Sequence, residues 1–494
     1  MATEIAPAGA PVPVAGAAPH PPTRTGALRG SLGVGSIVFM VVAAAAPLTV
    51  VGGAVPIAIL LGNGAGVPMM FLVSAIVLLF FAVGLSTMSR FVPRPGAFFT
   101  YVGYGLGRPM GLGTAHLALL TYTLIQAAVY GYLGGALQSS IVDLGGPSVP
   151  WWTWSLVVVA VTGYLGYRDI ELSSRVLGVL LAAEVGIVLL LDVAVIVKGG
   201  HSGLNAESFT PNQFLSGSPG IGLMFAVAGF IGFESTAIFR SEARDPDRTI
   251  PRATYAAVAI IGVFYTLSSW SLVQAWGVDK VVPAAAADPA GMIMATARDY
   301  LGGWADVTVH VLLLTSLFAC ILSFHNVITR YQHSMASATA MPSRFAAVHG
   351  RHRSPHVSSL VQTATAAVLV AVFAACRLDP ELQVFAWFSG IATLGIVVLM
   401  ALTCLAVIVY FRRNRSAVGA WQSLVSPVLG LVGLIAILVI VVANFATLIG
   451  GSSTLADIFI ALVVLSIVIG VVQARIIARR DPVAYDTLTD AISL

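Results

Sequence analysis

Residues Gly35 to Leu61 read GSIVFMVVAAAAPLTVVGGAVPIAILL, an apolar run that contains no charged side chain. A helix needs about 20 such residues to cross a bilayer, so the run is long enough to span a membrane. Pro47, Gly52 and Gly53 stand within it, where proline removes a backbone hydrogen-bond donor and glycine weakens the helix. The run therefore predicts a membrane-spanning helix that is broken near its centre.

The rest of the chain has the same apolar character. Hydrophobic residues make up 58% of the 494 residues and charged residues only 9%, whereas an ordinary soluble domain carries roughly 25% charged residues. A transmembrane β-barrel would instead show short segments of alternating polarity. The sequence therefore predicts an all-α integral membrane protein with twelve transmembrane helices, at residues 35–61, 67–89, 113–139, 152–167, 173–197, 220–239, 254–277, 305–329, 357–376, 386–411, 423–449 and 454–475.

Basic residues indicate how these helices are oriented. If the N-terminus is cytoplasmic, the cytoplasmic side holds all of the 25 Lys and Arg residues except Lys198, Lys280, Arg298 and Arg377. Because such a bias sets orientation during insertion, we expect a multi-pass protein of the cell membrane with both termini cytoplasmic. The net charge of +4 is scattered through short loops, so no nucleic-acid partner is expected.

Both ends of the chain are expected to be cytoplasmic tails. Residues 1–28 are rich in Ala and Pro and lack an apolar run long enough for a cleavable signal, so they are expected to be disordered. Residues 478–494 form the second predicted tail.

A second interruption lies in the sixth predicted span, five spans after the first. Transporters built from inverted repeats often bind their substrate where two such helices are broken near mid-membrane. The alternative is a pair of simple kinks, since glycine and proline are common in membrane helices. The predicted substrate-binding residues at the two breaks are Ala45, Ala46, Pro47, Leu48, Thr49, Gly52, Ala228, Gly229, Phe230 and Gly232.

Three motifs carry a resemblance to a known family. Residues 230–234 (FIGFE) and 242–253 (EARDPDRTIPRA) resemble the sixth helix and the following loop of the amino acid, polyamine and organocation transporter superfamily. Residues 93–101 (PRPGAFFTY) are similar to its Pro-x-x-Gly-Gly-x-Tyr-x-Tyr element. Residues 326–330 (NVITR) look like its Asn-x-x-x-Arg run, although the acidic residue that usually precedes the later Leu-Pro is missing before Met341-Pro342.

The resemblance implies a LeuT-like five-plus-five inverted repeat plus two C-terminal helices. Its transport core would cover residues 29–411, with repeats at about 34–197 and 220–411, and helices 11 and 12 would lie in residues 412–477. Substrate would bind between helices 1, 3, 6, 8 and 10. The implied function is a secondary active transporter, or permease, that moves an amino acid by alternating access.

The sequence departs from the family at both breaks. Many relatives expose amides in a Gly-Ser-Gly segment that holds the substrate carboxylate, whereas residues 45–49 here read AAPLT and offer fewer donors. The positive end of a half-helix still attracts an anion. Because the donors are fewer, a substrate without a carboxylate, such as a polyamine or an ethanolamine-type amine, remains an alternative. Ala228 replaces an aromatic gate residue, and the extra room suggests a bulky or branched apolar substrate.

Two carboxyl groups fall inside predicted spans, where burial favours the neutral form. Glu184 lies near the middle of span 5 with no basic residue within two helical turns, so we expect it to be buried without a local basic partner and to take up a proton during transport. Several relatives carry a lysine at the aligned position, which implies that Glu184 could hold either a proton or a cation. A permanently protonated, hydrogen-bonded Glu184 is the alternative. Glu234 is a second candidate for protonation or inner gating, with Arg240 and Arg244 as partners, unless these form a plain structural ion pair. Asp192 is expected at the membrane interface.

Aromatic side chains in spans 3 and 10 suggest contacts to an ammonium group. The candidates are Tyr122, Gln126 and Trp387, with interhelical packing as the alternative. His310 and His325 are interpreted as hydrogen-bonding struts.

The sequence lacks the usual marks of catalysis. It contains no closely spaced metal-ligand set, no phosphate-binding glycine loop and no nucleophile with a base, so we expect no metal, no cofactor and no enzymatic activity. Cys320, Cys376 and Cys404 imply no disulfide framework. Solute exchange is an alternative to proton coupling, and a channel-like or sensory membrane protein is the rival class. The oligomeric state stays open.

Overall fold

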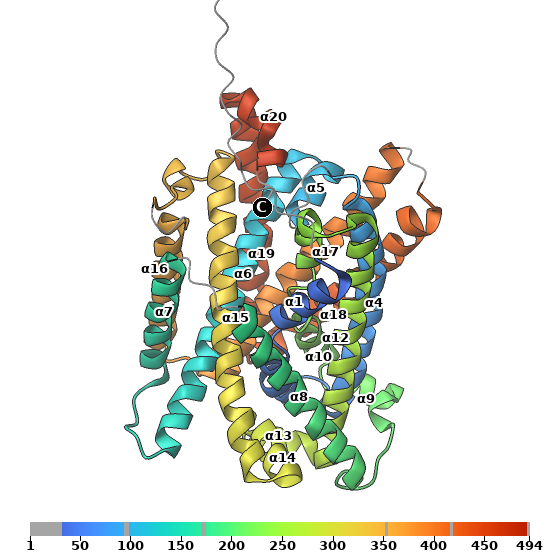
Figure 1. Ribbon diagram of the computed structural model, residues 1–494, viewed down its shortest axis with the longest axis vertical. Coiled ribbons are helices and arrows are strands. Elements are labelled where there is room, and N and C mark those ends of the chain that lie inside the picture. The colour runs from blue at the N-terminus through green and yellow to red at the C-terminus, as the bar shows by residue number, and fades with distance from the viewer. Residues whose placement is uncertain (1–31, 93–97, 169–173, 351–353, 415–417, 492–494) are drawn as a thin grey trace, which may run out of the picture.

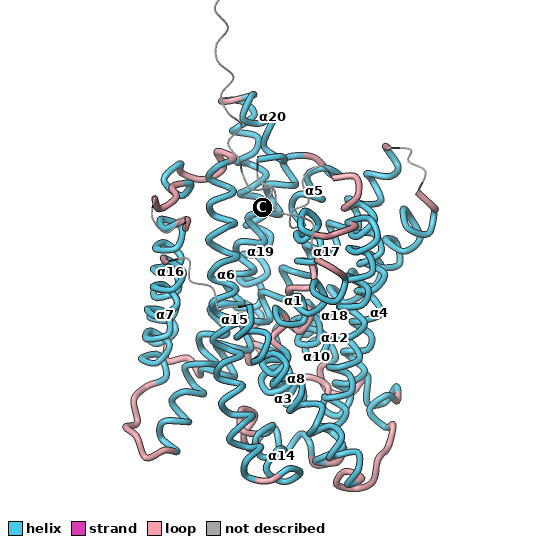
Figure 2. Tube along the Cα trace, viewed as in Figure 1, coloured by secondary structure: helices cyan, strands magenta, loops and turns pink. Residues whose placement is uncertain are grey.

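The computed structural model describes residues 32–92, 98–168, 174–350, 354–414 and 418–491, and these form a bundle of helices (Figures 1 and 2). Apart from one isolated bridge between Leu32 and Ala243, the described residues contain no strand. The α-helices are α1 (Val34–Ala44), α2 (Pro47–Thr49), α3 (Val55–Leu61), α4 (Val67–Met88), α5 (Phe98–Leu106), α6 (Arg108–Asp143), α7 (Trp151–Tyr167), α8 (Ser174–Lys198), α9 (Pro211–Phe214), α10 (Pro219–Ala228), α11 (Ser235–Ile238), α12 (Pro246–Trp276), α13 (Val281–Ala287), α14 (Met292–Leu301), α15 (Gly303–Ser337), α16 (His356–Ala375), α17 (Ala386–Arg413), α18 (Ser426–Leu448), α19 (Ser453–Arg480) and α20 (Pro482–Ala491). Three segments have π-helical geometry, namely Val50–Ala54, Pro380–Phe385 and Trp421–Val425, and short 3-10 turns occur at Gly64–Gly66, Glu207–Phe209, Phe239–Glu242 and Ser343–Ala346.

All twelve predicted spans are helical over most of their length, and ten stretches of the described chain are long and apolar enough to cross a membrane. The two exceptions have physical reasons. α7 has only 17 residues, and the predicted span 220–239 is divided into α10 and α11 by a turn. The protein is therefore an all-helical membrane protein, while the count of twelve spans and the inverted repeat remain predictions.

The outer surface of the bundle supports a lipid environment. Large apolar side chains are exposed on α8, α12, α18 and α19; Val193, Val263, Val439 and Val464 are each more than half exposed. A soluble monomer rarely exposes so much apolar surface in contiguous patches. Hydrocarbon is the solvent in which such side chains carry no penalty.

Several elements differ from the sequence-based expectations. α6 is longer than the predicted span 113–139 at both ends. The predicted tail 478–494 includes α20, where Arg108 on α6 pairs with Asp486 at 3.1 Å and stacks on the Tyr485 ring. Helices α13 and α14 lie between the seventh and eighth predicted spans and were not anticipated. The predicted N-terminal tail and residues 93–97 of the second motif lie outside the described residues.

The two interrupted helices pass each other in the middle of the bundle. α1 contacts α11, and α3 contacts α10, so each half of one helix lies beside a half of the other. α4, α17 and α18 contact α10, while α12 contacts α1 and α11, and α15 contacts α2 (Figure 1). Both interruptions consequently lie inside protein, which is the condition for irregular backbone at membrane depth.

Candidate functional site: a cavity between two broken helices

The first break lies at Ala45 and Ala46. Ala46 adopts a left-handed conformation with φ 46° and ψ 69°, which is uncommon for a residue that carries a side chain. Pro47 then begins α2 at the first helical position, where its missing N–H is no loss. The predicted break is thus present.

Tyrosines from two neighbouring helices hold this broken segment. The Tyr265 hydroxyl on α12 donates to the Ala45 carbonyl at 3.1 Å. The Tyr132 hydroxyl on α6 donates to the Gly52 carbonyl at 3.1 Å, within the π-helical segment Val50–Ala54. These bonds occupy carbonyl groups that an irregular backbone leaves without their usual intrahelical partners.

The second break spans the residues between α10 and α11. Gly232 has φ 111°, a conformation that glycine enters without steric cost. The Glu234 carboxylate accepts a hydrogen bond from the Gly232 N–H at 2.8 Å and one from the Tyr122 hydroxyl at 2.6 Å. Glu234 therefore ties the break in helix 6 to α6.

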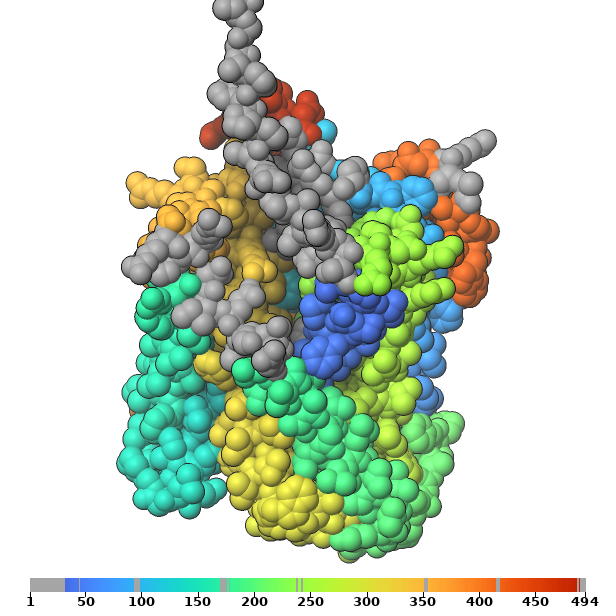
Figure 3. Space-filling model, in the orientation of Figure 1, coloured from blue at the N-terminus to red at the C-terminus, as the bar shows by residue number. Residues whose placement is uncertain are grey.

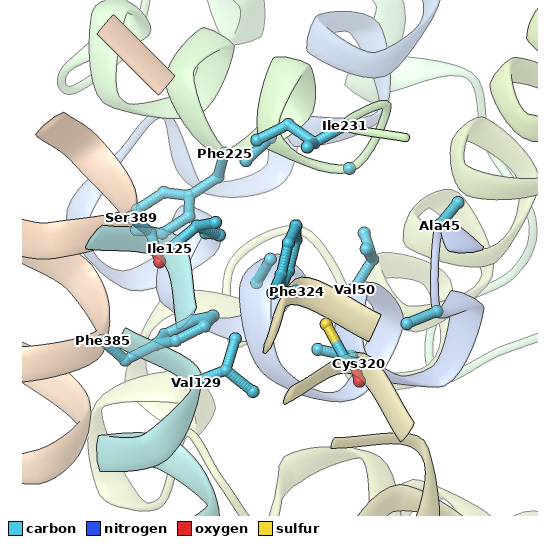
Figure 4. A pocket seen from close by; sticks show the side chains of 15 residues that line it. Ala45, Val50, Ile125, Val129, Phe225, Ile231, Cys320, Phe324, Phe385 and Ser389 are labelled. Atoms are coloured by element: carbon cyan, nitrogen blue, oxygen red, sulfur yellow. The ribbon is translucent and has the colours of Figure 1, made fainter. Parts of the chain in front are cut away.

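A cavity of about 490 Å³ lies where the two breaks meet (Figure 4). Helices 1, 3, 6, 8 and 10 of the predicted order all contribute to it, through α2, α6, α10, α15, α17 and adjoining segments. Its walls are mostly apolar, and none of its lining side chains is charged. The lining residues are Ala45, Ala46, Thr49, Val50, Ala54, Ile125, Val129, Phe225, Ala228, Gly229, Ile231, Cys320, Phe324, Phe385 and Ser389.

Five of the predicted binding residues line this cavity: Ala45, Ala46, Thr49, Ala228 and Gly229. The remaining eight lie nearby without lining it, and these are Pro47, Leu48, Gly52, Tyr122, Gln126, Phe230, Gly232 and Trp387.

The contacts of three of these side chains explain why they do not line the cavity. Gln126 donates to the Ile321 carbonyl at 3.0 Å and accepts from Gln362 at 2.7 Å, so its amide is engaged between helices. The Phe230 ring packs edge-on against Tyr265 with 6.2 Å between centroids. Trp387 is half-buried against the core.

Two hydroxyl groups supply polarity to the cavity wall. Thr49 donates to the Ser316 hydroxyl at 3.2 Å. Ser389 is 2% exposed, and its Oγ has no hydrogen-bond partner among the described residues. A buried hydroxyl without a partner is costly unless a ligand or water satisfies it. Ser389 lies two residues after the predicted Trp387 and lines the cavity, whereas Trp387 does not.

Glu184 lies behind the first break. It is 5% exposed, accepts from the Ser316 hydroxyl at 2.9 Å and also accepts from the Leu48 N–H. Among the described residues it takes part in no ion pair, so the expected burial without a basic partner is confirmed. Through Ser316, a continuous path of hydrogen bonds connects Glu184 to Thr49 at the cavity wall.

The other ionisable groups have the following environments. Arg240 pairs with Asp247, and Arg244 is exposed, so Glu234 bonds to Tyr122 in this state instead of either arginine. Asp192 is 3% exposed. Its side chain is buried among α8, α12 and α14, and its position relative to the membrane interface stays a prediction.

Two histidines were expected to be struts. His310 Nε2 lies 2.5 Å from the Ser140 hydroxyl, and His325 Nε2 lies 3.0 Å from the Ser359 hydroxyl. Both contacts join neighbouring helices. Within the part of the chain that the structure describes, no cluster of three or more His, Cys, Asp or Glu residues is arranged to hold a metal ion.

Comparison with known proteins agrees with this architecture. The profile of the family described as "Amino acid permease" matches residues 37–483. The chain is 25% identical over 315 residues to the branched-chain amino acid permease BcaP of Bacillus subtilis, a match that covers 60% of this chain and 65%, just under two thirds, of that protein. It is 23% identical over 377 residues to the low-affinity putrescine importer PlaP of Escherichia coli, covering 74% and 78% of the two chains. It is also 31% identical over 219 residues to the uncharacterized transporter Rv1999c of Mycobacterium tuberculosis, covering 44% and 47%.

Proposed function

Because the chain belongs to the amino acid permease family, we propose that it is a secondary carrier that moves an amino acid with an apolar side chain across the cell membrane by alternating access, driven by protons. The observation that carries the proposal is the cavity between the broken helices. Its walls come from several helices and it lies between the two breaks, which is where carriers built from broken helices bind a small solute.

The lining of the cavity favours an aliphatic or aromatic side chain. Phe225, Phe324 and Phe385 face the space from three helices (Figure 4), and Ile125, Val129 and Ile231 complete the wall. Burying an apolar side chain against these groups contributes roughly 25 cal/mol for each Å² removed from water. The alanine at position 228 leaves the space that a bulky or branched substrate requires.

A diamine such as putrescine fits this lining less well. It would bring two positive charges into the membrane interior, and no lining side chain carries a carboxylate to receive them. A zwitterionic amino acid has its own carboxylate to balance its ammonium group. The Ser389 hydroxyl and the backbone at the two breaks offer polar partners for that zwitterion. We therefore place the amino acid ahead of the amine.

The position of Glu184 suggests how protons are coupled to transport. Its carboxylate occupies the Leu48 N–H at the start of the half-helix after the break, where a substrate carboxylate would also be attracted. Two carboxylates at one helix end repel each other, so an entering substrate favours protonation of Glu184. The hydrogen bonds through Ser316 to Thr49 extend this influence to the cavity wall.

We assign barriers on two sides of the cavity to clusters of aromatic rings, which favours alternating access over an open pore. On one side Phe385 packs against Tyr132 and Phe225, with centroid distances of 4.9 and 6.4 Å. On the other side Tyr122 packs against Phe324 and Tyr331, at 6.1 and 5.6 Å. A carrier needs such barriers, which open in turn.

Competition in proteoliposomes tests the substrate class. The purified protein would be reconstituted and the uptake of labelled L-leucine measured against excess L-isoleucine, L-phenylalanine, L-lysine, putrescine and ethanolamine. We expect the apolar amino acids to compete and the amines to have no effect. Competition by putrescine or ethanolamine alone would overturn the proposed substrate class and leave the carrier architecture in place.

A further inference from the structure

A second, smaller cavity lies beside the buried carboxyl of Asp192. Its walls come from α8, α12, α14 and the π-helical segment Val50–Ala54. The polar lining consists of Asp192 and three hydroxyl residues, Ser268, Ser271 and Thr296, and each of the four side chains is 3% exposed or less. Every polar side-chain atom in this wall is therefore an oxygen.

We propose that this cavity is a binding site for a small monovalent metal cation such as sodium, separate from Glu184. Oxygen atoms of carboxylates and hydroxyls are suitable ligands for hard cations. Three elements supply them here, so the site is formed by the packing of helices and is absent from any single helix. Nothing in the proposed transport of amino acids requires this site.

Hydrogen bonds hold the potential ligands in place. The Ser268 hydroxyl donates to Asp192 Oδ2 at 2.8 Å. Thr296 Oγ1 donates to the Met292 carbonyl at 2.8 Å and accepts from Trp276 Nε1 at 2.9 Å. Partners of this kind orient ligand atoms before an ion arrives, which strengthens binding.

Charge balance also points to a cation. A carboxyl in the membrane interior must be neutralised by a proton, a basic side chain or an ion. Among the described residues, Asp192 takes part in no ion pair. Two basic groups on α14 and α8 are engaged elsewhere: Arg298 pairs with Asp306 at 3.7 Å, and the Lys198 amine donates to the Tyr300 carbonyl at 2.8 Å.

The cavity has room for about one water-sized sphere, so it suits a single desolvated ion and no larger ligand. α8 lies at the surface beside α14 and α15 (Figure 3), and its last turns expose Val193 and Val197.

The site adjoins the broken helix that lines the substrate cavity. Val51 faces the Asp192 cavity, and its neighbour Val50 faces the substrate cavity. A cation held at Asp192 therefore contacts the same π-helical segment that contacts substrate.

Thermal unfolding of the purified full-length protein in detergent tests the proposal without substrate. Sodium chloride would replace choline chloride at constant ionic strength and constant pH. We expect a saturable rise in Tm of about 2 °C or more for the native protein. Asp192→Asn, which keeps the size and the Ser268 contact, should abolish the rise.

Glu184→Gln is the matched control, since it neutralises another buried carboxyl on the same helix. It should retain the sodium response. Ser268→Ala should raise the half-saturating sodium concentration by about tenfold, and it decides the matter if Asp192→Asn fails to fold. The proposal is overturned by a native protein that ignores sodium, by an undiminished response in Asp192→Asn, by loss of the response in Glu184→Gln, or by a response to pH alone.

Discussion

Replacing Glu184 with glutamine should uncouple transport from the proton gradient. Glutamine retains an oxygen that can accept from the Leu48 N–H and the Ser316 hydroxyl, the two groups that contact Glu184. It cannot release a proton. The variant should therefore fold and bind substrate, but the proton gradient should no longer drive its accumulation.

The expected accumulation ratio follows if the Glu184 carboxyl carries one proton for each substrate molecule. A gradient of one pH unit is worth about 1.4 kcal/mol per proton, which corresponds to about a tenfold concentration ratio. With acid outside, the native protein should accumulate L-leucine about tenfold for each pH unit. Glu184→Gln should bring the internal and external concentrations to equality and no further.

The assay is uptake into proteoliposomes with an imposed pH gradient, followed by counterflow. Counterflow is exchange of labelled for unlabelled substrate, and it needs binding and alternating access without net proton movement. We expect it to survive in Glu184→Gln. Glu234→Gln is the comparison, because Glu234 is the other buried carboxyl beside the breaks. Continued accumulation by Glu184→Gln, or its loss in Glu234→Gln alone, would refute the assignment.

Three further substitutions test the cavity and the breaks. Ser389→Ala should raise the KM for leucine about fivefold, the equivalent of one lost hydrogen bond of about 1 kcal/mol, and should leave the Tm unchanged because Ser389 Oγ has no protein partner; an unchanged KM would remove Ser389 from the site. Gly232→Ala should lower stability by about 1–2 kcal/mol because of the positive φ, whereas Gly186→Ala on α8, where an added Cβ meets nothing within 4 Å, should be neutral or slightly stabilising in the same thermal melt. Ala228→Phe should fill part of the cavity and weaken leucine uptake more than alanine uptake in parallel kinetic assays, and equal effects on both would contradict the inferred substrate position.

The breaks were predictable because their cause is local. Pro47 cannot continue a hydrogen-bonded helix, and Gly232 permits a conformation that other residues avoid. Gly53 was expected to weaken the helix at the break, but the structure gives it a role in packing. It lies inside the π-helical segment, where an added Cβ would come within 3.0 Å of the Tyr132 ring. That glycine serves close packing, which depends on a residue far away in the sequence.

The cavity lining was harder to predict because most of it is apolar. Ile125, Val129 and Phe385 are indistinguishable in sequence from side chains that face lipid. Polar or aromatic candidates such as Gln126 attracted attention, yet this side chain bonds to neighbouring helices instead. In a helix buried on most sides, hydrophobic periodicity does not identify the face that meets a ligand.

Asp192 shows a third limit. Its place near the end of span 5 suggested the membrane interface, but the sequence did not show that its side chain is buried in part by α14, a helix that was not expected. Burial of a charged residue therefore depended on a segment whose structure was not anticipated.

Helices 1 and 10 each contain a π-helical segment, Val50–Ala54 and Pro380–Phe385. A π turn holds about one residue more than an α turn, so reverting to α geometry would rotate the helix beyond it by about 100°. Such a change swaps one set of backbone hydrogen bonds for another and never exposes bare peptide groups to hydrocarbon. In helix 10, this rotation about the helix axis would move the Phe385 ring away from Tyr132.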